Sequence, residues 1–164
     1  MKYIILLSFC FLFASTNVGF AQDKKDGVHL YNPAADAKKE LADALKKAKS
    51  EHKQVLVQIG GNWCAWCIKF HGFIEANPSL RDSIKANYVF LLVNYDREHL
   101  QEDLMKKWEH PSRFGFPCLL VLNADGKRLH TQDSALLEKG DGYDLEKVQH
   151  FLDMWTVKAV NAKK

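Results

Sequence analysis

The chain has 164 residues, of which 47% are hydrophobic and 26% charged, and its formal net charge is +3. This length and composition fit one globular domain whose core needs no disulfide staples, and they exclude collagen, a long coiled coil and wholesale disorder. Basic and acidic residues alternate along the chain, so we expect no interaction with nucleic acid.

The start of the chain has the pattern of a cleavable secretory signal peptide. A short positive start precedes an apolar run, and the small residues Gly19 and Ala21 stand at the recognition positions of a cut before Gln22. The apolar run is too short for a comfortable membrane span, and an uncleaved anchor is the alternative. We therefore expect residues 1–21 to be removed and residues 22–164 to form one domain in the periplasm or otherwise outside the cytoplasm.

Helical and strand patterns alternate in the first half of the mature chain. Apolar residues recur at helical spacing over residues 36–50, whereas residues 54–59 are mostly apolar, as in a buried strand. Pro78 suits the first position of a helix that Asn77 caps. The expected elements are a short strand at 28–31, a helix at 36–50, a strand at 54–59, and helices at 64–75 and 78–87.

The second half contains a strand pair joined by a tight turn. Asn123-Ala124-Asp125-Gly126 predicts that turn, and Pro111 ends the helix before it. The expected elements are a strand at 88–93, a helix at 97–109, strands at 118–122 and 127–131, a loop at 134–142 and a helix at 145–160 capped by Asp144. Alternation followed by a hairpin predicts an α/β fold with a mixed central β-sheet and helices on both faces.

Two cysteines stand where the strand at 54–59 gives way to a helix. The motif is Cys64-Ala65-Trp66-Cys67, and this spacing can close a disulfide across the first helical turn. Cys64 lies among the unpaired N–H groups of a helix start, which favour a thiolate. A thiolate attacks a disulfide sulfur, and a second thiol resolves the mixed disulfide, so we assign Cys64 as the nucleophile and Cys67 as the resolving cysteine. The alternatives are a structural disulfide or half of a metal site.

These motifs resemble the thioredoxin-like superfamily. Residues 55–67 resemble the family's strand and active-site loop, and residues 114–127 its proline segment and following hairpin. The Tyr31-Asn32-Pro33 start and the break at residues 77–80 are similar to exported bacterial thioredoxin-like proteins and to the periplasmic domain of membrane disulfide reductases. The resemblance extends over residues 31–160.

The resemblance implies a thioredoxin-like fold and further site residues. Pro117 would follow a cis peptide bond and lie against the cysteine pair, exposing the backbone of Phe116 to a substrate strand. A trans proline in a simple turn is the alternative. Trp63 would shield the nucleophile, so Trp63, Phe116 and Pro117 are the expected substrate-binding residues.

The sequence also departs from the family at three positions. Trp66 replaces one residue of the usual Gly-Pro pair, which tunes the redox potential in the family. Gln58 stands where thioredoxins bury an acid, and Leu92 stands where they place its lysine partner. Gln58 cannot take a proton at neutral pH, so Glu75 or a water is the candidate proton acceptor, and slower or differently poised resolution by Cys67 is the resulting hypothesis.

Cys118 is the third cysteine of the mature chain and follows Pro117 directly. It is interpreted either as a small buried strand residue or as a regulatory or metal-binding thiol. With His71, Cys64 and Cys67 it offers a ligand set that suits zinc or copper(I), although the leading interpretation includes no metal.

The leading function is thiol–disulfide exchange with exported protein substrates by a monomer. Electrons move between sulfurs, so the Cys64–Cys67 pair needs no dissociable cofactor. By resemblance alone, the expected partner is a membrane disulfide reductase or oxidase. The alternatives are a copper or zinc carrier that uses the same cysteines, and a non-catalytic interaction domain with a fixed disulfide.

Overall fold

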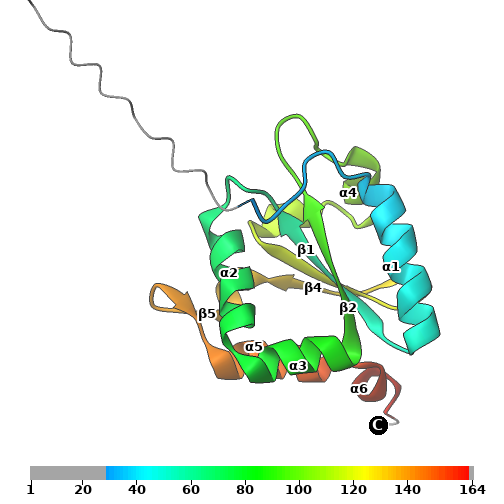
Figure 1. Ribbon diagram of the computed structural model, residues 1–164, viewed down its shortest axis with the longest axis vertical. Helices are drawn as coiled ribbons and strands as arrows, with labels where there is room; N and C mark the ends of the chain where they lie inside the picture. Colours follow the sequence, from blue (N-terminus) through cyan, green and yellow to red (C-terminus); the bar gives the residue numbers. More distant parts are fainter. Residues whose placement is uncertain (1–28, 163–164) are drawn as a thin grey trace, which may run out of the picture.

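The computed structural model describes residues 29–162, shown in colour in Figure 1. The predicted signal peptide and the first residue of the strand expected at 28–31 lie outside the described residues. In the part that is described, no helix has the length and apolarity needed to cross a membrane.

A four-stranded mixed sheet forms the centre of the molecule, as predicted. Its strands are β1 (Gln54–Gly60), β2 (Tyr88–Asn94), β3 (Cys118–Leu122) and β4 (Arg128–Asp133). Their order is β2-β1-β3-β4, with β1 parallel to β2 and antiparallel to β3, and β3 antiparallel to β4. Every residue of β1 and β3 is buried, because both strands have neighbours on each edge and helices on each face.

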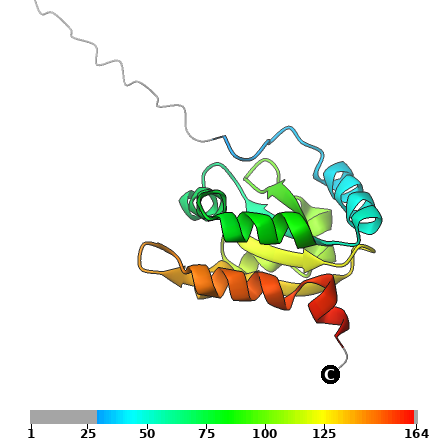
Figure 2. The same cartoon turned by 60° about the horizontal axis from the view of Figure 1, so that its bottom comes forward.

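Helices cover both faces of this sheet. The helices are α1 (Ala37–Glu51), α2 (Ala65–Ala76), α3 (Pro78–Asn87), α4 (Glu102–Lys107), α5 (Leu145–Met154) and α6 (Val157–Asn161). Apolar side chains of α1 and α4 pack on one face, and those of α2, α3 and α5 pack on the other. Figure 1 shows α1 and α2 with the sheet between them, and Figure 2 shows α3 and α5 side by side.

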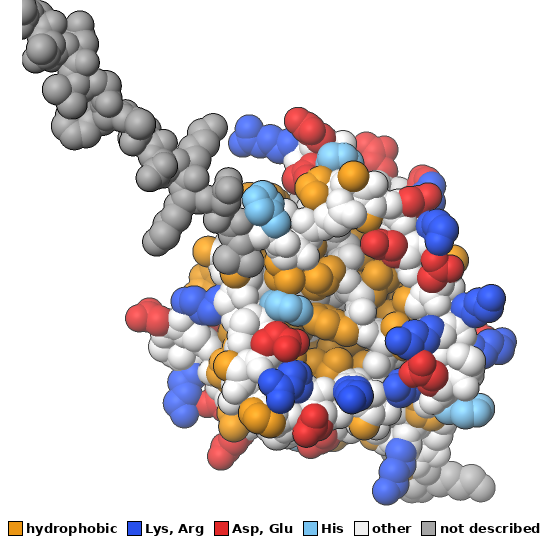
Figure 3. All heavy atoms as spheres, viewed as in Figure 1, with side chains coloured by type: hydrophobic (Ala, Val, Ile, Leu, Met, Phe, Trp, Pro, Cys, Tyr) orange, Lys and Arg blue, Asp and Glu red, His pale blue; other side chains and the backbone are white. Residues whose placement is uncertain are grey.

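Strand β2 forms one edge of the sheet. Its side chains at Val89, Phe90 and Leu92 are half-buried, and hydrophobic side chains gather over this part of the surface in Figure 3. The strand expected at 28–31 is absent over its described residues. The main-chain N–H and carbonyl of Tyr31 instead bond the side chain of Asn62, so they are not available to a strand ladder.

The helix expected at 97–109 is much shorter than predicted. Asp96 accepts hydrogen bonds from the side chain of Asn94 and from the main-chain N–H groups of Glu98 and His99, and these bonds lower the pKa of Asp96 to about 2. Gln101 has a positive φ of 49°. The main-chain N–H groups before α4 therefore bond the Asp96 carboxylate and do not form a helical turn.

Two further differences lie near the C-terminus. The expected loop at 134–142 contains a 3₁₀ turn (Ser134–Leu137) and a short pair of strands, β5 (Glu138–Lys139) and β6 (Gly142–Tyr143). The expected final helix is divided into α5 and α6, because the Thr156 side chain accepts from the N–H of Ala159 and starts a new helix.

Replacing Leu120 tests the central position of β3. Leu120 is fully buried, so we expect Leu120→Ala to lower the free energy of unfolding by about 2–5 kcal/mol. Leu136→Ala is the matched control, because that side chain is 68% exposed and its loss changes stability by about 0.5 kcal/mol or less. Urea unfolding measures both, and equal effects would contradict the placement of β3.

Candidate active site

Cys64 and Cys67 form a disulfide at the start of α2, with their Cα atoms 5.2 Å apart. Cys64 is the N-cap residue of α2, and its Sγ accepts a hydrogen bond of 3.1 Å from the main-chain N–H of Cys67. The sulfur thus lies at the positive end of a twelve-residue helix, which favours a negative charge there once the disulfide opens. Cys64 is 5% exposed and Cys67 is fully buried, so solvent and partners reach the pair from the Cys64 side.

The approach of Cys67 to the end of β1 depends on Gly60. A Cβ atom at this position would overlap Cys67 Sγ and would lie 2.8 Å from the hydroxyl oxygen of Tyr31. Only glycine leaves room for both groups against the strand. The glycine that ends β1 is therefore a packing requirement of the cysteine pair.

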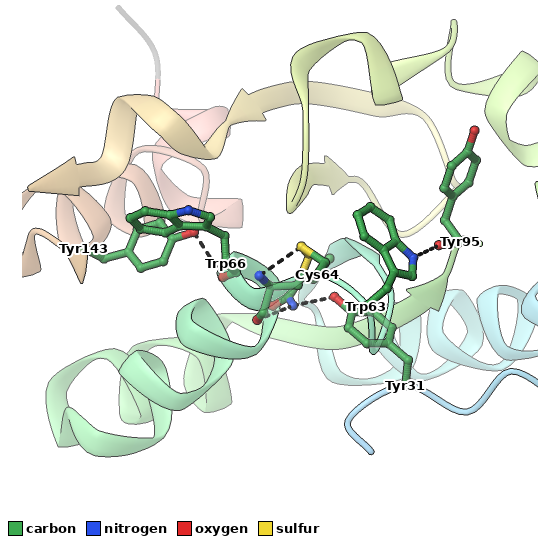
Figure 4. The surroundings of a disulfide bond; sticks show 8 residues. Tyr31, Trp63, Cys64, Trp66, Tyr95 and Tyr143 are labelled. Atoms are coloured by element: carbon green, nitrogen blue, oxygen red, sulfur yellow. Dashed lines mark hydrogen bonds between the residues drawn. A yellow bond between two sulfur atoms is a disulfide. The ribbon is translucent and has the colours of Figure 1, made fainter. Parts of the chain in front are cut away.

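Two tryptophans lie on opposite sides of the disulfide in Figure 4. Trp63 is 57% exposed and is held by a hydrogen bond of 2.8 Å from its Nε1 to the carbonyl of Tyr95. Trp66 packs edge-on against Tyr143 with 5.5 Å between ring centroids, and the ammonium of Lys69 lies 4.3 Å from its ring centre. Trp66 is therefore fixed on the helix, while Trp63 presents an apolar surface to solvent.

The Phe116–Pro117 peptide bond is cis, as the resemblance implied, and Pro117 is buried. Phe116 packs against the cysteine pair, edge-on to Trp63 at 5.3 Å and stacked on Tyr95 at 5.1 Å. Trp63, Tyr95 and Phe116 form one wall of a groove of about 890 Å³. The other lining residues are Pro33, Asp96, Arg97, Glu98, His99 and Leu100.

Gln58 is fully buried beneath the disulfide and is hydrogen-bonded to an unforeseen partner. Its Nε2 donates to the carbonyl of Cys67 at 3.1 Å and to the hydroxyl oxygen of Tyr31 at 2.6 Å. Figure 4 shows the Tyr31 hydroxyl directed toward this region. Burial raises the pKa of Tyr31 well above its usual value of 10.0, so the phenol stays protonated at neutral pH.

Sequence reasoning missed the role of Tyr31 and of Asn62, which positions it. The Asn62 side chain accepts from the N–H of Tyr31 and donates to its carbonyl, both at 2.8 Å. Tyr31-Asn32-Pro33 and Gly60-Gly61-Asn62 are visible as motifs, yet nothing in the sequence joins two positions so far apart. Leu92 does pair with Gln58 across the parallel strands, as expected.

Three residues suggested by the sequence lie away from the pair. Glu75 is exposed near the far end of α2 and cannot serve Cys67 as a proton acceptor. Cys118 is buried in the core on the α1 face, where burial and, to a lesser extent, the charge of Asp133 raise its pKa to about 12. The His71 ring stacks on Phe90.

The suggested zinc or copper site is therefore not assembled. Across residues 29–162 no group of three or more His, Cys, Asp or Glu side chains has the arrangement needed to hold a metal ion. Cys118 has the properties of the small buried strand residue that was one of its two interpretations.

Comparison with known proteins gives matches to thioredoxin-like proteins. A family model described as a thioredoxin-like domain matches residues 41–136. The disulfide bond reductase DsbH of Chlamydia pneumoniae is 30% identical over 94 residues, which are 54% of this chain and 57% of that protein. The chain thus spans little more than half the length of this curated relative.

Solved structures that share the fold include two bacterial proteins. A disulphide isomerase from Xylella fastidiosa Temecula1 is 23% identical with a TM-score of 0.68, and the match covers 76% of this chain and 95% of that one. The C-terminal domain of Neisseria meningitidis DsbD in its oxidised form is 19% identical with a TM-score of 0.52, covering 73% and 96%.

Replacing Gly60 tests the close approach of Cys67 to β1. We expect Gly60→Ala to lower the free energy of unfolding of the oxidised protein by about 1–3 kcal/mol, because the new methyl group displaces Cys67 or Tyr31. Gly72→Ala is the control: it lies within α2 with open space around it, so alanine there stabilises by about 0.5–1 kcal/mol. If Gly60→Ala proved neutral in urea unfolding, the contact would be refuted.

Proposed function

The chain belongs to the thioredoxin-like family, and from this premise we propose that it is an exported thiol–disulfide oxidoreductase acting on protein substrates. The observation that carries the proposal is the Cys64–Cys67 disulfide at the N-terminus of α2, with Phe116 of the cis-proline segment packed against it. A buried structural disulfide needs neither an activating helix start nor an apolar groove beside its outer sulfur.

The reaction proceeds through a mixed disulfide. The Cys64 thiolate attacks one sulfur of a substrate disulfide, and the other substrate sulfur leaves as a thiolate that takes a proton from solvent. Cys67 then attacks Cys64 Sγ, which releases the second substrate sulfur. The substrate has gained two electrons, the Cys64–Cys67 disulfide has formed, and no dissociable cofactor takes part. The reverse sequence oxidises a dithiol substrate.

The groove beside Trp63 is the proposed substrate site. Trp63, Leu100 and Phe116 give it apolar surface, and Phe116 also packs against the cysteine pair. An extended, cysteine-containing segment of a protein substrate suits such a surface. A membrane disulfide reductase or oxidase is the proposed partner that restores the reactive state, and the working form is a monomer.

Trapping and redox titration test the activity. We expect the dithiol to equilibrate with glutathione at a potential between about −270 and −120 mV. Cys64→Ser abolishes exchange, whereas Cys67→Ser accumulates the mixed disulfide because the resolving thiol is lost. Cys118→Ala is the control and leaves exchange unchanged, since that thiol lies in the core on the α1 face. A potential below about −300 mV, with no mixed disulfide trapped, would identify a fixed structural disulfide instead.

Export is tested on the full chain in a bacterial host. We expect the protein in the periplasmic fraction with Gln22 as its first residue, because Gly19 and Ala21 suit the cleavage site. Ala21→Phe places a bulky residue at the cut and leaves the leader attached, whereas the neighbouring control Asn17→Gln is processed normally. Full-length protein in the cytoplasmic fraction would refute this part of the proposal.

A further inference from the structure

Tyr31 is brought to the active site by its own main chain. The two reciprocal hydrogen bonds with Asn62, each 2.8 Å, join the segment before α1 to the loop that carries Trp63 and Cys64. The Tyr31 side chain is 2% exposed and packs against both cysteines. Because both the main-chain N–H and the carbonyl of Tyr31 are hydrogen-bonded and its ring packs on the disulfide, this residue has little freedom to move away.

The hydrogen bonds of Gln58 determine which way the phenol proton can point. The carbonyl of Cys67 only accepts, so the Gln58 group that faces it is the NH₂ group, Nε2. The same Nε2 also donates to the Tyr31 oxygen at 2.6 Å. Tyr31 is therefore the acceptor in this contact, and its own O–H proton is left free for another acceptor.

The sulfur of Cys67, which belongs to the same packed cluster as Tyr31, is a candidate acceptor. A Cβ atom of Gly60 would lie 2.8 Å from the Tyr31 oxygen and would overlap Cys67 Sγ, so both atoms border the same point beside the glycine. Among the hydrogen bonds of residues 29–162, none uses the phenol proton while Cys67 is in its disulfide. The side chains packed around the pair, Leu30, Trp66, Leu92 and Phe116, are uncharged.

We propose that Tyr31 is a positioning residue that donates a hydrogen bond to the Cys67 thiolate when the disulfide opens. The inference rests on the proposed thiol–disulfide exchange and names the group that prepares its second step. The Cys67 thiol gives its proton to solvent, and the departing substrate thiolate takes up a proton from solvent. The phenol proton of Tyr31 is not transferred. The Cys67 thiolate then forms the bond to Cys64 Sγ, and the bond between Cys64 and the substrate breaks.

A protonated phenol suits this role better than a base would. Its raised pKa keeps it a donor throughout the neutral range, and a thiolate in an uncharged, buried site needs a donor to offset its lost hydration. Gln58 supports the phenol by donating to it, which polarises the O–H group toward the sulfur. The pair Tyr31–Gln58 thus stabilises a charge without carrying one.

The test measures the pKa of Cys67 in the full mature chain carrying Cys64→Ser, by NMR of the labelled Cys67 Cβ across pH. We expect Tyr31→Phe to raise this pKa by about one unit, which reduces the thiolate fraction about tenfold at pH values well below the pKa. In the chain with both cysteines, resolution of the mixed disulfide slows about threefold, because the thiolate of higher pKa is rarer but a stronger nucleophile. The matched control is Tyr88→Phe, which also removes one buried hydroxyl and one hydrogen bond, to Leu152, on a distant part of the core.

The outcomes separate the two proposals. A Cys67 pKa that is the same in Tyr31→Phe and Tyr88→Phe overturns the role of Tyr31, even if exchange activity is intact. Absence of exchange in the unsubstituted chain refutes the oxidoreductase instead, because the pKa readout uses no substrate. If Tyr31→Phe does not fold, the Cys67 pKa is measured in a protein with fluorotyrosine at position 31. This more acidic phenol of nearly the same shape must lower the Cys67 pKa, and an unchanged value overturns the inference.

Discussion

The contact between Cys67 and the end of β1 is the constraint on which the site depends. Strand β1 is buried along its whole length, so its last residue sits at a fixed place in the centre of the molecule. Because Gly60 has no side chain, the first turn of α2 can descend onto it and bury Cys67 Sγ. That descent places Cys64 at the helix start, and it leaves a space next to the sulfur that the phenol of Tyr31 occupies.

The buried layer beneath the disulfide is neutral. Thioredoxin-like proteins that keep a buried acid and a lysine at these positions must compensate the desolvation of two charges. Here Leu92 lies opposite Gln58 across the strands, and the polar groups that remain are an amide and a phenol. The amide Nε2 donates to the phenol oxygen, while Gln58 Oε1 has no hydrogen-bond partner among the described residues. Neither group ionises near neutral pH, so this layer keeps the same charge across the physiological range of pH.

Local signals in the sequence predicted most elements and the chemistry of the site. Asp36 caps α1, Cys64 begins α2, and Asn123 closes the hairpin turn through its side chain, all within a few residues of the groups they bond. What could not be predicted depends on contacts between distant residues. The face to which Cys118 points follows from its pairing with Ile59, whose side chain lies in the α1 core, and that register is not visible in either strand alone.

The tie between Tyr31 and Asn62 has a consequence for where the functional unit begins. The sheet, both cysteines and the cis proline all lie in the chain from α1 onward, and a fragment starting at Ala37 contains every strand of the four-stranded sheet. Such a fragment has lost the phenol, and with it the cover over Cys67 on that side. The residues that build the disulfide site thus begin upstream of the first described helix or strand, in a segment that has no regular structure of its own.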